Sequence, residues 1–452
     1  MNTIAAISSP IGAGGIGIVR VSGKDALKIS DAIFNFAHNT GRDDANHTRQ
    51  IWRPLFMNFG TFDAEDFKDV GYAVYFPAKN AYTGEDTVEF YLHGGVRIMR
   101  GALETLLKNG AVMAKNGEFT KRAFLNGRLS LADAEGVIDM INAESAAGLR
   151  AAYRLMEGEV AGRINAILER LEVFMATIEA TLDYPDEMED EVLPNVEKNI
   201  EEILVKVEDL IATAKNGKIA KYGLTVALAG NPNAGKSSLM NALLKDNRAI
   251  VTPVAGTTRD TVEDSFEYDG VKITLVDTAG IRESSDLVES EGIERAKKAI
   301  ESADVVLHVI DATSDGKDDI DLEGKLVFDV YNKCDLLPKD KLEKLKSNKN
   351  KHEVFEVSAK TGEGIEQIAK AIASLFKENK VEGGEMITSA RHVSALYQAK
   401  SSLESALVSK DATLDVLLID LSNAYNALGE ITGKTATEDV VDSIFSRFCV
   451  GK

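Results

Sequence analysis

The sequence predicts a multidomain α/β protein, and three patterns indicate this class. Short β-branched strands separated by turns dominate the first 118 residues. Strands alternate with helices between residues 218 and 380, which is typical of a mostly parallel sheet. Apolar residues recur at helical spacing on both sides of that region. At about 150 residues per domain, the 452 residues suggest two to four domains.

Residues 1–118 are expected to form a β-rich α+β domain, with strands at residues 2–7, 16–21, 71–76 and 87–92. The glycine-rich segment Ile11–Gly17 contains the spacing G-x-G-x-x-G. A dinucleotide-binding loop would have to open a helix, whereas the alternating segment Ile18–Ser22 that follows is typical of a strand. We therefore reject dinucleotide binding and expect a glycine-rich, hairpin-like loop.

Two further segments of the N-terminal region have an unusual density of polar residues. One comprises Tyr82–Asp86 and Glu89–Gly95 around the strand predicted at 87–92, and the other is Gly117–Arg128. Both are expected as loops beside the β framework, and ordinary turn chemistry is the competing interpretation.

Helical periodicity begins at Leu131 and continues to Leu182, where an apolar stripe indicates packing. Pro185 is expected to end this helix and to open an acidic linker over residues 183–191. Further helices are predicted at residues 196–211, 393–407, 413–428 and 437–448. Neither flank is long enough to bury both sides of its helices. We therefore expect one helical domain, residues 119–217 and 381–452, interrupted by an inserted domain at 218–380.

Composition limits the classes of function. The two cysteines, Cys334 and Cys449, fit a reducing compartment. No apolar run reaches the length of a membrane span, and no basic segment precedes the first apolar residues, so we expect a cytoplasmic protein. A formal net charge of −20 argues against general nucleic-acid binding. An RNA partner would have to meet a local basic patch.

The inserted region opens with a phosphate-binding motif. A predicted strand at residues 224–229 is followed by G-x-x-x-x-G-K-S and then by a predicted helix from Leu239. Such a loop turns backbone N–H groups toward a polyphosphate at a helix N-terminus. Lys236 is expected to reach the β- and γ-phosphates, and the Ser237 hydroxyl to bind Mg²⁺. The competing interpretation is a Gly/Asn-rich turn without a ligand. The residues of this loop that are predicted to bind GTP are Asn233, Ala234, Gly235, Lys236, Ser237 and Ser238.

Three further motifs follow at the ends of predicted strands. Residues 271–276 lead into Asp277, Thr278, Ala279 and Gly280, where the carboxylate is expected to hold Mg²⁺ through water. After a strand at 305–310, a strand at 326–331 leads into Asn332, Lys333, Cys334 and Asp335. The Asp335 carboxylate can accept two parallel N–H bonds from guanine, which adenine does not offer. A strand at 354–357 delivers the base-supporting residues Ser358, Ala359 and Lys360. Together the motifs predict a Ras-like P-loop GTPase domain that binds GTP.

Three of these segments resemble the Era/Der/TrmE branch of GTPases: Pro232–Asn233, Gly256–Asp260 and Asp277–Arg282. Ile281 stands where Ras-like proteins carry the Gln that orients the attacking water, so hydrolysis must use other groups. The resemblance implies a K⁺ ion near Asn233 that supplies positive charge to the phosphates. It also implies that Glu289 positions water, for which a solvated surface acid is the competing interpretation.

The same resemblance implies the remaining ligands of the nucleotide and its ions. Catalysis would use Glu289, Lys236 and Asn233, and the second Mg²⁺ ligand would be Thr258. The K⁺ ligands would be Asn233, Thr252, Val254 and Thr257. The first switch would contact GTP through Thr252, Pro253, Val254, Ala255, Gly256, Thr257 and Thr258.

The order of motifs over essentially the whole chain resembles the MnmE (TrmE) family of tRNA modification GTPases. The resemblance rests on Arg20, on the two polar segments, on the split helical domain and on Phe448–Lys452. It implies an N-terminal domain that dimerises and binds a formyl-tetrahydrofolate through Arg20, Glu89, Arg128 and Lys452. Arg128 stands where some relatives carry Lys, which keeps the charge but changes the donor geometry. Cys449 is a candidate for covalent chemistry, with plain packing as the competing interpretation.

The family resemblance also implies partners and a reaction. An FAD-dependent MnmG (GidA) protein would join the homodimer and carry the flavin. The pair would add a carboxymethylaminomethyl or aminomethyl group at C5 of the tRNA wobble uridine. GTP binding and hydrolysis in the presence of K⁺ and Mg²⁺ would move the GTPase domains, and the helical domain would carry that motion.

Two other functions compete with this one. An Era/Der-like ribosome-assembly GTPase would predict a basic RNA-binding domain after the GTPase domain, and the acidic, helical C-terminal region argues against it. The second alternative is a GTPase that only switches interactions with partners and has lost the formyl-tetrahydrofolate site. The joint presence of Arg20, Glu89, Arg128 and Lys452 argues against that alternative.

Overall fold

The computed structural model describes residues 1–37, 52–246, 263–277, 297–314, 322–338, 352–376, 386–409 and 413–452. The chain divides into two compact units. Unit 1 comprises Met1–Ile138, Leu155–Ile203 and Ser401–Lys452, and unit 2 comprises Asp139–Arg154 and Leu204–Lys400. The boundaries fall inside four helices: α4 (Leu131–Ile141), α5 (Ala146–Met156), α7 (Pro185–Tyr222) and α12 (Ala390–Val408). The division by function into four segments stays a prediction.

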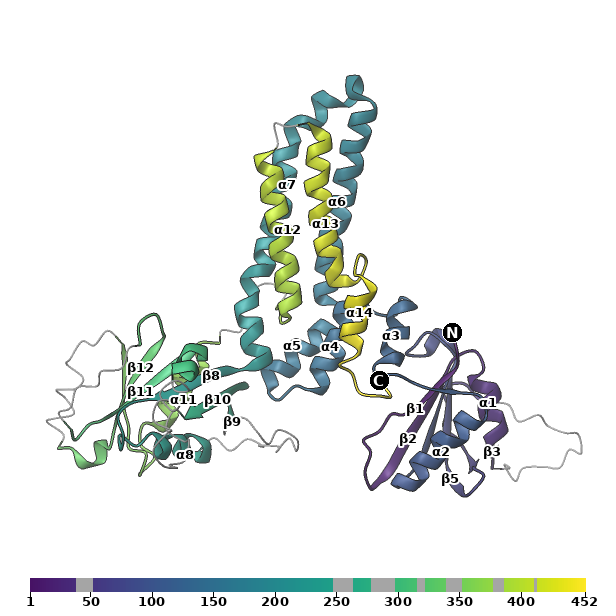
Figure 1. Ribbon diagram of the computed structural model, residues 1–452, viewed down its shortest axis with the longest axis horizontal. Helices are drawn as coiled ribbons and strands as arrows, with labels where there is room; N and C mark the ends of the chain where they lie inside the picture. Colours follow the sequence, from purple (N-terminus) through teal and green to yellow (C-terminus); the bar gives the residue numbers. More distant parts are fainter. Residues whose placement is uncertain are drawn as a thin grey trace, which may run out of the picture. The chain divides into compact units, whose positions relative to one another are not determined.

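The N-terminal part of unit 1 is a seven-stranded sheet in the order β3-β4-β5-β6-β2-β1-β7. Its strands are β1 (Ile4–Ile7), β2 (Gly14–Ser22), β3 (Phe34–Phe36), β4 (Asn58–Asp63), β5 (Lys68–Phe76), β6 (Thr87–Gly94) and β7 (Val112–Met113). Helices α1 (Ala26–Ile33) and α2 (Val96–Lys108) lie along this sheet (Figure 1). Phe34, Phe62 and Phe90 are fully buried in the core between them. The four strands expected from the sequence are confirmed.

The glycine-rich segment leads into a strand, as the sequence predicted. Strand β2 begins at Gly14 and pairs antiparallel with both β1 and β6, with a register shift between Gly14 and Gly17. A Cβ atom at Gly17 would lie 2.3 Å from the Met99 sulfur, so a larger residue here would require the Met99 side chain on α2 to move. A strand and not a helix follows the glycines, so the prediction of a strand at this point is confirmed.

The prediction that residues 117–128 form a loop is wrong, because helix α3 (Glu118–Leu125) occupies most of this segment. Gly117 starts the helix with a φ of 62°. Arg122 lies on α3 with only 4% of its side chain exposed, and its two terminal nitrogens bind Glu85 and Glu118, each at 2.8 Å. The charges of Arg122, Glu85 and Glu118 are therefore paired with one another.

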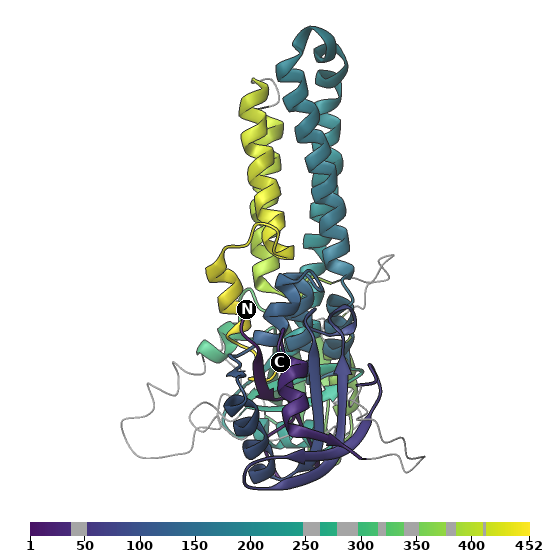
Figure 2. The same cartoon turned by 90° about the vertical axis from the view of Figure 1, so that its right-hand side faces the viewer.

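The long helices of unit 1 are α6 (Glu159–Asp183), the first part of α7, and α13 (Leu414–Thr432). Helices α6 and α13 run side by side over most of their length (Figures 1 and 2). The predicted acidic linker is wrong, because α7 begins at Pro185 and continues through the acidic segment. Proline suits the first turn of a helix, where its missing N–H costs no hydrogen bond. Only Tyr184 lies between the end of α6 and the start of α7.

The C-terminal tail packs on the N-terminal sheet after the last helix, α14 (Glu438–Phe445). The Ser8 hydroxyl donates to the Gly451 carbonyl at 3.2 Å, and the Gly117 N–H donates to the Cys449 carbonyl at 3.3 Å. A Cβ atom at Gly451 would lie 2.2 Å from the Ile7 carbonyl oxygen. The tail therefore requires glycine at this position.

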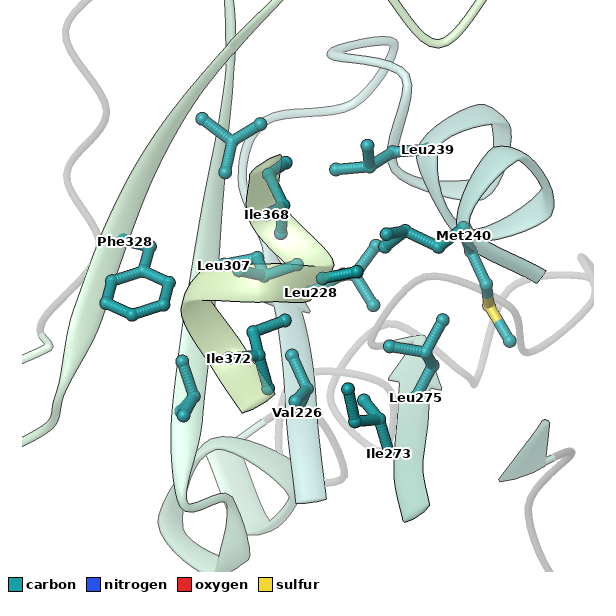
Figure 3. Close-up of a cluster of buried hydrophobic side chains, with 14 of the residues drawn as sticks. Val226, Leu228, Leu239, Met240, Ile273, Leu275, Leu307, Phe328, Ile368 and Ile372 are labelled. Atoms are coloured by element: carbon teal, nitrogen blue, oxygen red, sulfur yellow. The ribbon is translucent and has the colours of Figure 1, made fainter. Parts of the chain in front are cut away.

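Unit 2 contains a six-stranded sheet in the order β13-β12-β11-β8-β10-β9. Its elements are β8 (Leu224–Ala229), α8 (Lys236–Asp246), β9 (Glu263–Tyr268), β10 (Val271–Asp277), β11 (Val305–Asp311), β12 (Val327–Asn332), the 3-10 helix η2 (Cys334–Leu336), β13 (Glu353–Glu356) and α11 (Ile365–Ala373). Strand β9 pairs antiparallel with β10, and the other neighbouring pairs are parallel. Leu228, Leu239 and Ile368 meet in the core between strands and helices (Figure 3). The predicted α/β domain with a mostly parallel sheet is confirmed.

The described part of the chain contains no helix long and apolar enough to cross a membrane.

Candidate functional site

The phosphate loop connects the end of β8 to the start of α8. Asn233 has a φ of 66° and Gly235 a φ of 96°, both in the left-handed region. Glycine enters this region without strain, and asparagine is one of the few other residues that tolerate it. Gly230 packs so closely on β11 that a Cβ atom would lie 2.1 Å from the Val309 carbonyl oxygen. The backbone conformation of the loop therefore follows directly from its residue types.

Lys236 occupies the inside of this loop. Its ammonium group donates to the carbonyl oxygens of Gly230 at 2.7 Å and Asn231 at 2.9 Å, and the residue is 7% exposed. A cation held at the mouth of a helix N-terminus is placed to attract phosphate oxygens.

A pair of oxygen donors lies beside the loop. The Ser237 hydroxyl donates to the Asp277 carboxylate at 3.1 Å, which joins the first turn of α8 to the end of β10. Mg²⁺ prefers hard oxygen ligands and keeps several waters, and a hydroxyl beside a carboxylate is such a donor set. The residues present therefore fit the ion.

The candidate base-binding residues are tied to the phosphate loop by hydrogen bonds. Asn332 is 2% exposed; its amide nitrogen donates to the Ala234 carbonyl at 2.9 Å, and its amide oxygen accepts from the Ala359 N–H at 3.0 Å. The Ser358 hydroxyl donates to the Asp335 carboxylate at 2.8 Å. The buried Asn332 side chain thus connects the phosphate loop to the loop that contains Ala359.

Asp311 completes this network and was missed by the sequence analysis, which ended its strand at Ile310. Lys333 donates to the Asp311 carboxylate at 2.7 Å and to the Asn233 carbonyl at 2.9 Å. Burial acts to raise the pKa of Asp311, but the hydrogen bonds from Lys333 and Thr313 outweigh it and lower the pKa. The signal was available, because the last residue of a parallel strand lies at the edge where ligands bind.

Several predicted site residues lie outside the described residues: Thr252, Pro253, Val254, Ala255, Gly256, Thr257, Thr258, Thr278, Ala279, Gly280 and Glu289. Of the expected K⁺ ligands, Asn233 is described. Ser238 and Lys360 are described and exposed.

A second cluster of site candidates lies on the N-terminal sheet. Arg20 on β2 and Glu89 on β6 are directly opposite in register, and their side chains form an ion pair with an Nε–Oε1 distance of 2.7 Å. The Tyr91 hydroxyl donates to the other Glu89 oxygen at 2.6 Å. The Arg20 guanidinium lies 5.4 Å from the centre of the Phe119 ring on α3. Burial, followed by the hydrogen bond to Glu89, raises the pKa of Tyr91 to about 12.

The other two candidates for folate binding make separate contacts. Arg128 is exposed and donates to the Ala78 carbonyl at 2.5 Å. Lys452 is exposed at the end of the tail, next to the Gly451 contact with β1. The sequence analysis missed Tyr91 and Phe119. Tyr91 could have been found, because residues two apart on a strand share a face with Glu89.

Comparison with known families shows which family the chain belongs to. A model described as the MnmE helical domain matches residues 131–449, and one described as the GTP-binding protein TrmE N-terminus matches residues 3–128. The chain belongs to the MnmE family. The tRNA modification GTPase MnmE of Caldicellulosiruptor saccharolyticus is 39% identical to this MnmE-family chain, covering 100% of it and 99% of the relative. The MnmE proteins of Aquifex aeolicus and Shouchella clausii are 40% and 38% identical over 99% and 100% of it.

The alignments also cover 99% or more of each relative's own length. Among solved structures, Era of Aquifex aeolicus bound to GDP and AlF4− is 30% identical, covers 40% of this chain and 66% of its own, and has a TM-score of 0.28. The family predicted from the motif order is confirmed.

Proposed function

We propose that this MnmE-family GTPase couples GTP hydrolysis to modification of the tRNA wobble uridine, using K⁺ and a folate-borne carbon. The observation that carries the GTPase part is the Asn332 bridge between the phosphate loop and the base-supporting loop. Because this bridge holds the two loops together, one GTP molecule can place its triphosphate on Lys236 and its guanine on Asp335. Membership of the family supports tRNA as the object of the modification.

Within this proposal, Ser237 and Thr258 bind Mg²⁺, with Asp277 acting through water. Asn233 contributes to a K⁺ site that also uses Thr252, Val254 and Thr257. The support for Asn233 is its left-handed backbone, with its carbonyl held by Lys333 and so fixed at the edge of the loop. Glu289 positions the attacking water, because Ile281 offers no hydrogen bond for that task.

The N-terminal domain, in this proposal, dimerises and binds 5-formyltetrahydrofolate through Arg20, Glu89, Arg128 and Lys452. The donor set suits such a ligand, because a carboxylate can pair with the donors of a pterin edge and cations with a glutamate tail. Arg20 and Glu89 form one end of that set in direct contact. The folate supplies a one-carbon unit, and these residues bind and orient it.

Charge distribution bears on how a tRNA meets such an acidic chain. Residues 1–118, the predicted N-terminal domain, carry 12 Lys and Arg against 13 Asp and Glu, whereas the whole chain carries 52 against 72. Almost all of the excess of acid therefore lies outside the N-terminal domain. We propose that the tRNA approaches in a cytoplasmic complex with the FAD-dependent MnmG (GidA) protein, which carries the flavin.

GTP turnover in matched K⁺ and Na⁺ buffers tests the ion mechanism. Turnover is expected to be at least about tenfold faster in K⁺, because a fixed cation stabilises charge that develops in the transition state. Equal rates would remove K⁺ from the mechanism. In K⁺, Glu289→Ala is expected to slow hydrolysis while leaving GTP binding intact.

Reconstitution with MnmG, tRNA, GTP and the folate tests the reaction itself. The expected product is a uridine modified at C5 in the wobble position, detected by mass spectrometry of nucleosides. A chain that hydrolyses GTP and binds ribosomal subunits, without modifying tRNA, would instead support a ribosome-assembly GTPase.

A further inference from the structure

The segment Asp139–Arg154, which we call the joint segment, belongs to unit 2 together with the nucleotide-binding sheet. It consists of the end of α4, the connection to α5, and most of α5. Both helices continue past it into unit 1. Helices α4 and α5 therefore each contribute residues to both units.

Strand β10 connects this joint segment to the nucleotide site. Its last residue, Asp277, accepts a hydrogen bond from Ser237, and its second residue, Lys272, forms an ion pair with Glu144 of the joint segment. Just before the strand, the Gly270 carbonyl accepts a hydrogen bond from the Ala147 N–H at 2.9 Å. At about 3.3 Å per residue, the strand spans roughly 20 Å between these contacts. Strand β10 is paired on both sides, with β8 and with β9, which restrains its bending.

The end of α7 also contacts the joint segment. Lys221 in its last turn forms an ion pair with Asp139 at 2.7 Å, and these side chains are 23% and 14% exposed. Asp139 lies in the last turn of α4, where the helix dipole disfavours an acid, and the Lys221 ammonium compensates for it. Gly223, which follows α7, lies so close to Lys272 that a Cβ atom would be 2.3 Å from its carbonyl oxygen. The two ion pairs thus occupy one small region.

This region is loosely packed. A cavity of about 330 Å³ lies there, lined by both ion pairs as well as Tyr222 and Thr388. The Thr388 hydroxyl is buried and has no hydrogen-bond partner among the described residues. The remaining walls include the small residues Ala143, Gly148, Ala151 and Ala152. Elements around a gap of this size can shift against one another more easily than elements in a close-packed core.

We propose that the Lys272–Glu144 ion pair couples the nucleotide state at the end of β10 to the joint segment, and so links GTP turnover to tRNA modification. The proposal rests on the proposed function and deepens it. Lys272 and Glu144 bind no nucleotide in this mechanism and act as positioning residues. Of the two ion pairs, this one joins the nucleotide-bearing strand directly to the connection between α4 and α5.

Charge reversal tests the proposal in the full-length protein. Glu144→Lys and Lys272→Glu are each expected to lower the amount of tRNA modified per GTP hydrolysed about tenfold, a typical size for coupling between sites. GTP affinity and turnover are expected to stay within about twofold, since these residues lie away from the phosphate loop. The double variant restores the opposite charges and is expected to recover most of the coupling.

The more exposed ion pair Lys108–Glu65, in the N-terminal domain, provides a control away from the joint segment. Glu65→Lys, Lys108→Glu and their double variant are expected to leave the coupling ratio unchanged. Unchanged coupling in Glu144→Lys would overturn the proposal, and so would a double variant that stays as impaired as the single ones. A wild-type chain that hydrolyses GTP but never modifies tRNA would overturn the proposed function and this inference with it. Wild-type coupling with no effect of Glu144→Lys would overturn the inference alone.

Discussion

The nucleotide site and the N-terminal Arg20 cluster are built in different ways. The phosphate loop takes its shape from consecutive residues, with Asn233 and Gly235 in left-handed conformations directly before Lys236. Arg20 and Glu89 are 69 residues apart in the chain and meet because β2 and β6 pair in one register. A slip of one residue would send the two side chains to opposite faces. The first site is therefore encoded locally, and the second depends on the folded sheet.

The largest expected effect is in the local site. Lys236→Ala is expected to weaken GTP binding at least about 100-fold, because hydrogen bonds to charged groups are worth about 1.5–3 kcal/mol each and this ammonium can make two. Titration with a slowly hydrolysed GTP analogue measures the loss. Lys245→Ala, at an exposed position of the same helix, is the control. Folate binding is expected to stay unchanged in both, and a coupled loss would contradict the separation of the two sites.

Arg20→Ala is expected to weaken binding of 5-formyltetrahydrofolate about 10- to 100-fold, which calorimetric titration can measure. The change removes a cation and leaves the half-buried Glu89 carboxylate without its ion-pair partner, and breaking such a pair is costly. Arg97→Ala, an exposed arginine of α2, is the control. Unaltered binding in Arg20→Ala would show that the N-terminal cluster is a structural ion pair.

How much the sequence predicted follows the same division. The strands around the phosphate loop and the order of its motifs could be predicted, since apolar runs and turn residues act over a few positions. Helix α3 could not, because its charged residues looked like a solvated loop until Arg122 was found between Glu85 and Glu118. The acidic run after Pro185 was predicted as a linker for a related reason. Proline stops a preceding helix but equally well starts a new one, and local pattern does not distinguish these.

Within the nucleotide site, a substitution at Asp335 tests whether guanine specificity depends on a few consecutive residues, as phosphate binding does. Asp335→Asn is expected to reduce the preference for GTP over ATP by about tenfold or more, because one charged acceptor for two guanine donors is lost. Competition binding with both nucleotides measures this preference. Asn still accepts from Ser358, so the loop is expected to keep its shape. An undiminished preference would mean that the backbone around Ser358–Lys360 selects guanine instead.

The smallest expected effect concerns the hydrogen bond by which Tyr91 orients Glu89 in the N-terminal cluster. With a pKa of about 12, Tyr91 keeps its proton throughout the range in which the protein is handled, so it donates to Glu89 at every such pH. Tyr91→Phe removes that donor and is expected to weaken folate binding by about fivefold, the equivalent of about 1 kcal/mol for one hydrogen bond. Affinity should remain independent of pH in both proteins between about pH 6 and 9. If Tyr91→Phe binds as tightly as the wild type, Arg20 alone orients Glu89. The cluster would then resemble the phosphate loop in depending on a single decisive cation.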